Sequence, residues 1–515
     1  MPARAINLYN TMTQRLEPLD PAEPGHVRLY VCGPTTYDHV HAGHARTFIA
    51  FDVLVRFLRA SGYRVTFVRN MTDVDDKILQ RAQQNGEPPL SFSKRMAAIN
   101  AEELRACGCI EPDFEPRVSQ NIERIVALVE SLIAKDRAYV ASTAKGNDVY
   151  FAVRAFPSYG KLSHRVLDEL LAGARVEPGE AKRDPLDFAV WKAASSDELG
   201  WASPWGHGRP GWHIECSAMA ERHLSAHFDI HGGGMDLIFP HHENEIAQSE
   251  AAWGAPFARL WMHSGFLTVD AEKMGKSLGN FVTVAQILER NDSEALRYFV
   301  LGAHYHGPLN FDLEHRADGR ILFPGLDEAE RRVDYLYATS EALAAAAVGV
   351  APSLEGADDD QAGTLRHAPA RVLEALGADL NTSVALSVVG DVAKVGNDIV
   401  QQVAKARRDP NALARARSLA AAALETLGKT VGPLGLLQAS CVDFIGRTRK
   451  RRLKVRGLSE AAIEARVSER NAARAAKDFA RADRIRSELS ELGVELKDSP
   501  GASAAGATTS WRICV

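Results

Sequence analysis

VRLYVCGPTTYDHVHAGHARTFIAFDVLVRFLRASGYRVTFVR, residues 27–69, is the stretch that decides the fold. Apolar residues alternate over residues 27–31, the period of a strand, and Cys32-Gly33-Pro34 breaks that strand. Apolar residues then recur at helical spacing over residues 48–58, and a second strand is expected over residues 64–69. A strand, a helix and a strand of this length form a βαβ unit, which predicts an α/β fold with a Rossmann-like parallel sheet.

The motif His41-Ala42-Gly43-His44 falls in the turn between the first strand and the helix. Parallel sheets bind ligands at the carboxyl ends of their strands, and a helix N-terminus at that edge attracts anions. His41 and His44 could therefore hydrogen-bond the phosphates of a nucleotide, and Gly43 would let its base and ribose come close to the backbone. Two histidines near a turn are otherwise often plain surface residues, so the motif alone leaves both interpretations open.

The length of 515 residues predicts several domains. We expect the parallel sheet to be split, because the α/β pattern stops near residue 110 and resumes near residue 206. After residue 325 the composition shifts to Ala, Leu, Glu and Arg, which is typical of a helical bundle. The predicted domains are residues 1–110 and 206–325 for the two halves of the α/β domain, 111–205 for an inserted module, 326–440 for the bundle and 441–515 for a small C-terminal domain.

Local patterns predict several further elements. Thr283 and Gln286 have the spacing of a capping box, which predicts a helix start. Gly232, Gly233 and Gly234 favour a turn, with close approach of a ligand as the alternative. The remaining expectations are a mostly helical segment over residues 103–133, a strand over 260–269, an exposed loop over 351–367 and one helix over 461–492.

Charge and composition exclude some classes of protein. There are 61 Lys and Arg residues against 66 Asp and Glu, and the net charge of −5 argues against a wholesale polyanion binder, although a basic patch can still bind RNA. Six scattered cysteines are too few for a disulfide framework and favour a reducing, cytoplasmic setting. The sequence also contains no apolar run of roughly 18 residues, so no membrane span is expected. Residues 1–16 lack the pattern of a secretory signal.

Cys32, Cys216, His241 and Glu245 are candidate zinc ligands, because zinc binds thiolates, imidazoles and carboxylates. His241 and Glu245 are four residues apart on an expected helix, so both side chains leave the same face. A metal that joins all four would lie in the crevice between the two halves of the sheet. The alternative is two buried cysteines and an ordinary helical His/Glu pair, and the spacing of dispersed ligands does not exclude it.

A second charged motif, Lys273-Met274-Gly275-Lys276-Ser277, follows the expected strand at residues 260–269. Lys273 and Lys276 on a glycine-containing loop could neutralise the charge that builds on a departing pyrophosphate. A solvated loop with two lysines is the alternative.

Taken together, these segments resemble the cysteinyl-tRNA synthetases, which are class I aminoacyl-tRNA synthetases. The likeness rests on the stretch from YVCGP (30–34) through RT (46–47), and on VRNMTDVDDK (68–77), GWHIECSAM (211–219), FDIHGGG (228–234), FPHHENE (239–245) and KMGKSLGN (273–280). It continues through LNF (309–311), LNT (380–382), RNAAR (470–474), KD (477–478) and WR (511–512), and so covers nearly the whole chain.

The resemblance implies a reaction and a set of partners. One zinc ion per chain, held by Cys32, Cys216, His241 and Glu245, would bind the sulfur of L-cysteine and so distinguish it from serine. Trp212 and His231 would line the amino-acid pocket with Thr72 and Asp236, while His41, Gly43, His44, Lys273 and Lys276 would handle ATP and its Mg²⁺. The enzyme would form cysteinyl-adenylate and transfer cysteine to its tRNA, whose anticodon end the bundle and the segment after Arg447 would hold. The resemblance also implies a cytoplasmic enzyme, and we expect a monomer.

Two alternatives are a ligase that joins cysteine to an amino sugar and an inactive relative that binds RNA. The resemblance near residues 470–512 argues against the first alternative, and the intact set of ligands and lysines argues against the second. The helix geometry also leaves His242 open as a ligand in place of His241, since His242 and Glu245 are three residues apart.

The chain departs from the family pattern at Ala42, where a larger apolar residue is usual, at Gly275, where serine is usual, and in a longer stretch over residues 501–510. We predict that the missing hydroxyl at Gly275 slows adenylate formation somewhat, while both lysines keep the charge of the loop. Gly275→Ser should therefore speed adenylate formation in single-turnover measurements. An unchanged rate would contradict this interpretation.

Overall fold

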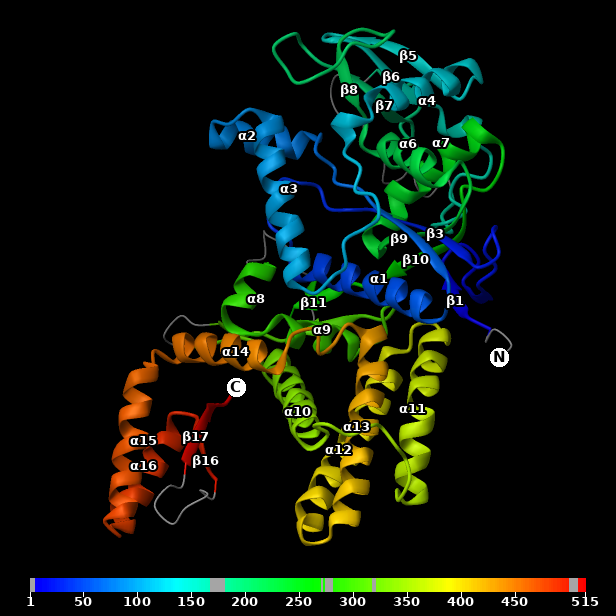
Figure 1. Cartoon of the computed structure of the whole chain (residues 1–515). Coiled ribbons are helices and arrows are strands. Elements are labelled where there is room, and N and C mark those ends of the chain that lie inside the picture. Colours follow the sequence, from blue (N-terminus) through cyan, green and yellow to red (C-terminus); the bar gives the residue numbers. More distant parts are fainter. Residues whose placement is uncertain (1–4, 167–180, 270–271, 274–280, 317–320, 500–507) are drawn as a thin grey trace.

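The computed structural model of the chain describes residues 5–166, 181–269, 272–273, 281–316, 321–499 and 508–515 (Figure 1). At its centre lies a parallel sheet with the strand order β10-β9-β3-β4. Helix α1 (Ala42–Ala60) connects the two strands at one side of this order, so the predicted βαβ unit and α/β fold are confirmed. The strands are β3 (His26–Val31), β4 (Arg64–Arg69), β9 (Phe228–Gly234) and β10 (Ala258–Ser264).

Helix α1 is buried along most of its length, because it packs against the sheet on one side and against the helical part of the molecule on the other (Figure 1). The apolar residues that predicted it, among them Phe48, Phe51, Val55 and Leu58, all belong to the large core that joins the sheet to the helices. Helix α1 therefore links a ligand that binds at its N-terminus to both the sheet and the helical part of the molecule.

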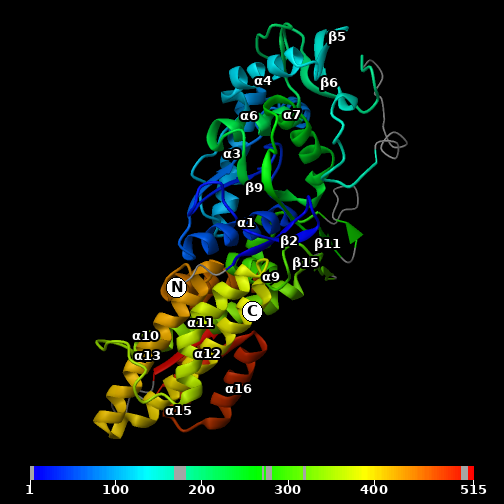
Figure 2. The same ribbon diagram turned by 90° about the vertical axis from the view of Figure 1, so that its right-hand side faces the viewer.

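A mixed module lies between β4 and the second half of the sheet, at the end of the molecule opposite to the C-terminal helices in both views (Figures 1 and 2). It contains an antiparallel sheet with the order β5-β6-β7-β8. The elements between β4 and β9 are α2 (Asp76–Asn85), α3 (Pro89–Ala106), α4 (Ile122–Ala134), β5 (Ala138–Thr143), β6 (Gly146–Phe151), β7 (Phe188–Ala193), β8 (Gly208–Pro210) and α6 (Trp212–Leu224). Helix α7 (Glu243–Trp253) connects β9 to β10.

Below the parallel sheet in Figure 1, two small sheets and two short helices lead into the helical bundle. They are β11 (Leu267–Val269), β12 (Glu272–Lys273), α8 (Val284–Arg290), α9 (Ser293–Leu301), β13 (Leu309–Phe311), β14 (Glu314–His315) and β15 (Ile321–Leu322). The capping box at the start of α8 is present as predicted. A hairpin of β1 (Asn7–Asn10) and β2 (Arg15–Pro18) packs beside β10.

The bundle consists of α10 (Pro324–Ala346), α11 (Asp359–Gly377), α12 (Thr382–Lys405) and α13 (Pro410–Val431). The chain then continues through α14 (Cys441–Arg456), α15 (Glu460–Ala475), α16 (Phe479–Glu491), β16 (Val494–Ser499) and β17 (Thr508–Ile513). Among the helices described here, none is both long enough and apolar enough to cross a membrane.

Three predicted helical or loop boundaries were wrong. Residues 107–121 between α3 and α4 are not α-helical, because Gly108 turns the chain at a φ of 72° after α3 ends. The expected loop over residues 351–367 ends early, since Asp358 caps α11 by accepting a hydrogen bond from the backbone of Gln361. The expected helix over residues 461–492 is two helices, α15 and α16, separated by Lys477 with a φ of 61°.

Two glycine-containing stretches also differ from the prediction. Gly232, Gly233 and Gly234 belong to β9 rather than to a turn, and a Cβ atom at Gly232 would collide with the ring of Phe51 on α1. The single strand expected over residues 260–269 is divided into β10 and β11 at Gly265, where a Cβ atom would collide with the carbonyl oxygen of Gly307. Glycine therefore marks two close approaches near the carboxyl edge of the sheet, one by a side chain at Gly232 and one by a backbone segment at Gly265.

Candidate active site and metal centre

A cavity of about 390 Å³ opens at the carboxyl edge of the parallel sheet. Such edges are where parallel α/β sheets bind their ligands. Besides the predicted residues, Ser264, Gly265, Phe266, Leu267 and Phe281 line the cavity. The predicted site residues in its wall are Cys32, His41, Gly43, His44, Thr72, Trp212, Cys216, Asp236 and His241.

The remaining predicted residues lie behind this wall or outside the described part of the chain. His231 and Glu245 are fully buried, and His231 Nε2 lies 2.8 Å from Glu245 Oε2. The backbone of Lys273 belongs to β12. The side chain of Lys273 and all of Gly275 and Lys276 fall outside the residues that the structure describes.

The four candidate metal ligands come together from four separate elements. Cys32 follows β3, Cys216 lies in the second turn of α6, His241 lies in the π-helical turn Ile238–His242, and Glu245 lies in the first turn of α7. Their ligand atoms all lie within 4.8 Å of one another. The Sγ atoms of the two cysteines are 3.7 Å apart, and His241 Nε2 is 2.9 Å from Glu245 Oε1.

The chemistry of this group fits a zinc ion. It offers two thiols, one imidazole and one carboxylate, which are the ligand types that zinc prefers. All four side chains are buried, and a carboxylate with two thiols in such a place needs a cation or protons to balance its charge. The spacing in the sequence did not exclude two buried cysteines and an ordinary helical His/Glu pair. The convergence of the four ligand atoms favours the metal site over that alternative.

The electrostatics of the group also favour a cation. The hydrogen bond from Cys32 is the main cause that lowers the pKa of the Cys216 thiol to about 6. Burial opposes ionisation of Glu245, but the neighbouring charges of His231 and His241 hold the pKa of this carboxyl well below its usual range. Burial and the hydrogen bond with Cys216 raise the pKa of Cys32. The group thus holds a carboxylate and one readily ionised thiol away from solvent.

The structure favours His241 over His242 as the imidazole ligand. His241 Nε2 lies 3.6 Å from Cys216 Sγ, whereas His242 Nε2 lies 4.0 Å from Glu245 Oε1 and belongs to a set without Cys216. His242 Nδ1 instead bonds His263 Nε2 at 2.8 Å. His263 was missed from the sequence, because no local pattern connects it with a residue 21 positions away.

Trp212, Thr72 and Asp236 border the same cavity as the metal ligands. The Trp212 ring stacks on the ring of His241 with 4.3 Å between their centroids, and 37% of the residue is exposed. Thr72 is buried and donates to Glu215 Oε2 at 3.4 Å. An aromatic wall and small polar groups beside a metal site suit a small amphipathic ligand.

The HAGH motif forms the N-terminus of α1 at the cavity. His41 is the N-cap residue, and its Nδ1 accepts a hydrogen bond from the backbone of His44 at 3.3 Å. The rings of His41 and His44 stack with centroids 3.6 Å apart, and Phe281 packs edge-on against His41. The helix dipole at this end favours an anion, although the backbone N–H groups of Ala42 and His44 already donate to Val282 O and His41 Nδ1.

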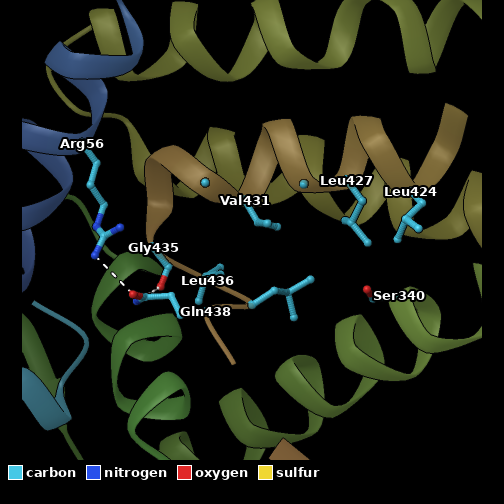
Figure 3. Close-up of a pocket in the computed structure, with 11 residues that line it drawn as sticks. Arg56, Ser340, Leu424, Leu427, Val431, Gly435, Leu436 and Gln438 are labelled. Carbon is cyan, nitrogen blue, oxygen red and sulfur yellow. Dashed lines mark hydrogen bonds between the residues drawn. The ribbon is translucent and has the colours of Figure 1, made fainter. Parts of the chain in front are cut away.

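A second cavity, of about 330 Å³, lies between the bundle and the C-terminal half of α1 (Figure 3). Its wall is mainly aliphatic and includes Leu424, Leu427 and Val431 of α13. At one end Arg56 of α1 bonds Gln438 at 3.3 Å (Figure 3). None of the predicted site residues is among the described residues that line it.

Comparison with known proteins agrees with this arrangement. Residues 18–318 match the family model described as tRNA synthetases class I (C) catalytic domain. A protein of Anaeromyxobacter sp. (strain K) named "Cysteine--tRNA ligase" is 48% identical over 516 residues, which cover 99% of this chain and 100% of the relative. A protein of the same name from Oleidesulfovibrio alaskensis is 46% identical, with 97% of this chain and 99% of the relative covered.

Solved structures show the same fold at lower identity. The Mycobacterium tuberculosis methionyl-tRNA synthetase in complex with methionyl-adenylate superposes with a TM-score of 0.60 at 17% identity, covering 85% of this chain and 94% of that one. A leucyl enzyme from Agrobacterium radiobacter K84, solved as the ternary complex LeuRS-tRNA-LeuAMS, gives a TM-score of 0.56 at 12% identity, covering 82% and 87%. The chain belongs to the cysteine–tRNA ligase family of the class I aminoacyl-tRNA synthetases.

Proposed function

We propose that this chain is a cysteine–tRNA ligase, which activates L-cysteine with ATP and transfers it to the 3′ end of the tRNA for cysteine. The observation that carries the proposal is the buried Cys32, Cys216, His241 and Glu245 group in the same cavity as the N-terminus of α1. The curated relatives of matching length carry the name of this activity.

In the first step, an oxygen of the cysteine carboxylate attacks the α-phosphorus of ATP, and pyrophosphate leaves with the bonding electrons. In the second step, a terminal ribose hydroxyl of the tRNA attacks the acyl carbon of the adenylate and loses its proton, and AMP leaves. Neither step needs covalent chemistry from the protein, so positioning and charge stabilisation dominate. We assign phosphate binding to the N-terminus of α1 with His41 and His44, and charge neutralisation to Lys273, Lys276 and a Mg²⁺ ion bound with ATP.

Selection of cysteine over serine is the role that we propose for the metal group. Cys32, Cys216, His241 and Glu245 would hold one zinc ion, which prefers a thiolate to a hydroxyl and lowers the pKa of the thiol that binds it. An ordinary pocket separates nearly isosteric side chains by only about 1–3 kcal/mol. Trp212, His231, Thr72 and Asp236 would then orient the rest of the amino acid beside the metal.

We assign binding of the anticodon end of the tRNA to residues 326–440 and 441–515. Within the basic run over residues 447–452, however, three arginines are excluded as phosphate contacts. Arg447 and Arg451 bond Asp292, and Arg452 is buried and bonds Glu330 at 2.7 Å. These three arginines hold α14 against α9 and α10 and are therefore poor candidates for phosphate contacts. Lys450 and Lys454 of the same helix remain as better ones.

We further propose that the enzyme acts as a monomer in the cytoplasm, one zinc ion to each chain. The free cysteines, which include four buried ones, suit a reducing compartment.

The proposed function is tested by ATP–pyrophosphate exchange with each amino acid in turn. We expect exchange that depends on L-cysteine and is not supported by L-serine, followed by transfer of labelled cysteine to tRNA. Exchange without transfer to tRNA, but with transfer to an amino sugar, would identify the sugar ligase instead. Binding of tRNA without any exchange would identify an inactive relative and reject the proposal.

A further inference from the structure

We infer that Arg46 is a positioning residue that holds the HAGH end of α1 against the strand carrying Lys273, and thereby sets the geometry of the ATP site. This inference rests on the proposed function. It assigns a role to a side chain that does not line the cavity.

Arg46 lies two residues after His44 on α1 and is almost fully buried, with 1% of the residue exposed. Its guanidinium group bonds backbone carbonyls from two other segments. NH1 donates to Phe266 O at 2.5 Å, and NH2 donates to Gly307 O, to Tyr305 O at 3.3 Å and to His304 O at 3.4 Å. The planar fork of an arginine can serve several carbonyls at once, which a lysine ammonium does less well.

The segment that Arg46 holds is part of the wall of the active-site cavity. Ser264 to Leu267 all line that cavity, and Thr47, the next residue on α1, bonds Ser264 at 2.6 Å between the two hydroxyl oxygens. Gly265 donates its backbone N–H to Tyr305 O at 2.7 Å, so the two segments bonded by Arg46 are also bonded to each other. The wall segment over residues 264–267 is thus bonded both to α1 and to the backbone of residues 304–307, with one cation at their junction.

The same junction leads directly to the lysine motif. β11 begins at Leu267, one residue after Phe266, and its Thr268 pairs with Lys273 in β12. On its other side β11 pairs with β13, and Leu309 also donates to Phe266 O at 3.1 Å. Arg46 therefore fixes the start of the strand against which the backbone of Lys273 is aligned. One side chain connects the two phosphate motifs that are 229 residues apart, counted from His44 to Lys273.

Electrostatics argue against a purely space-filling role. Among the described residues, no carboxylate forms an ion pair with Arg46, whereas Arg297, which is equally buried, bonds Asp52 at 2.7 Å. Burial lowers the pKa of Arg46 to about 10, which still leaves it charged at neutral pH. A buried cation without an anionic partner is costly, and an apolar side chain would fill the same space at lower cost. The cation and its carbonyl bonds must therefore serve the geometry of the junction.

The test measures cysteine-dependent ATP–pyrophosphate exchange for the full-length chain with Arg46→Lys and Arg46→Gln. We expect kcat/KM for ATP to fall about tenfold in Arg46→Lys and about a hundredfold in Arg46→Gln, because a misplacement of about 1 Å costs on that order. The KM for cysteine and the zinc content should stay at the wild-type values, since the metal ligands come from other elements. Replacing a residue with a purely structural role would not lower kcat/KM for ATP while leaving the KM for cysteine unchanged.

Arg297→Gln is the matched control. Arg297 is a fully buried arginine that bonds Asp52, Cys107 O and Leu434 O, and it does not line the active-site cavity. We expect this variant to lower the melting temperature without changing the KM for ATP. Equal ATP kinetics in Arg46→Gln and wild type would overturn the inference, and so would an equal loss for ATP in Arg297→Gln. If the wild-type chain shows no cysteine-dependent exchange, the proposed function itself fails, which is a separate and earlier result.

Discussion

Replacing Cys32 with serine is expected to abolish binding of the zinc ion proposed for this site and, with it, cysteine-dependent adenylate formation. Cys32 Sγ lies 3.7 Å from Cys216 Sγ and 3.4 Å from Glu245 Oε1, so it is in direct contact with two other members of the four-residue group. Loss of a group that only hydrogen-bonds to a metal ligand typically costs about 10- to 100-fold in metal affinity or activity, and loss of a ligand should cost more. We expect a fall of at least about a hundredfold in cysteine-dependent ATP–pyrophosphate exchange, together with less than one zinc per chain by plasma mass spectrometry.

Cys107→Ser is the matched control, because Cys107 is also a buried free cysteine but lies outside the metal group. This variant should keep its zinc and its exchange activity. Chelation of the wild-type enzyme should abolish exchange and added zinc should restore it, whereas zinc should not restore Cys32→Ser. Full activity of metal-free wild type would show that the group is structural or idle and that cysteine is selected in another way.

Much of the fold follows from local patterns, and the parts that do not follow are explained by contacts between distant segments. The alternation before Cys32 and the helical spacing after His44 predicted β3 and α1, although both elements are buried on almost all sides. Gly232 was predicted to be in a turn, since glycine has low strand propensity. Its pairing with Val31 and Met262 places it in β9, and the ring of Phe51 leaves no room for a side chain there.

The candidate site was likewise predicted only in part, because local patterns do not report contacts between distant segments. Residue types alone identified Cys32, Cys216, His241 and Glu245 as suitable ligands, but only the fold shows that they converge. Arg46 was not predicted at all, because its partners are backbone carbonyls of Phe266, Tyr305 and Gly307, and carbonyls leave no trace in a sequence.

The segment after Arg447 was assigned to the tRNA from the family resemblance, and the acidic partners of the arginines in its basic run, residues 447–452, are far away in the sequence. Glu330 on α10 is 1% exposed and accepts hydrogen bonds from Arg451 and Arg452 with its Oε1, at 2.5 Å and 2.7 Å. Its Oε2 accepts from Asn291 and from the backbone of Asp292. This carboxylate therefore joins the bundle, the segment between α8 and α9, and the C-terminal unit.

Glu330→Gln is expected to weaken the attachment of the C-terminal unit to the bundle and to the segment between α8 and α9. Removing one partner of a buried ion pair typically costs about 3–5 kcal/mol, because the remaining charge is left buried without compensation. Arg452 keeps Asp334 and Arg451 keeps Asp292, so we expect about 3 kcal/mol, the lower end of this range. Thermal unfolding should show an earlier transition for the C-terminal half of the chain. The KM for tRNA in aminoacylation should rise, while cysteine-dependent ATP–pyrophosphate exchange should stay unchanged, because the first reaction step does not use this joint.

Glu328→Gln on the same helix provides the comparison that makes this outcome specific. Glu328 pairs with Arg331 and Arg332 at the surface, with 53% of its side chain exposed, and an exposed pair contributes only about 0–1 kcal/mol. Equal stability and equal tRNA kinetics in the two variants would contradict a role for Glu330 in placing the C-terminal unit. A loss of pyrophosphate exchange in Glu330→Gln would also contradict it, since the joint would then act on the active site itself. The arginines of α14 are thus expected to affect tRNA binding through the orientation of the helices they hold and not through direct phosphate contacts.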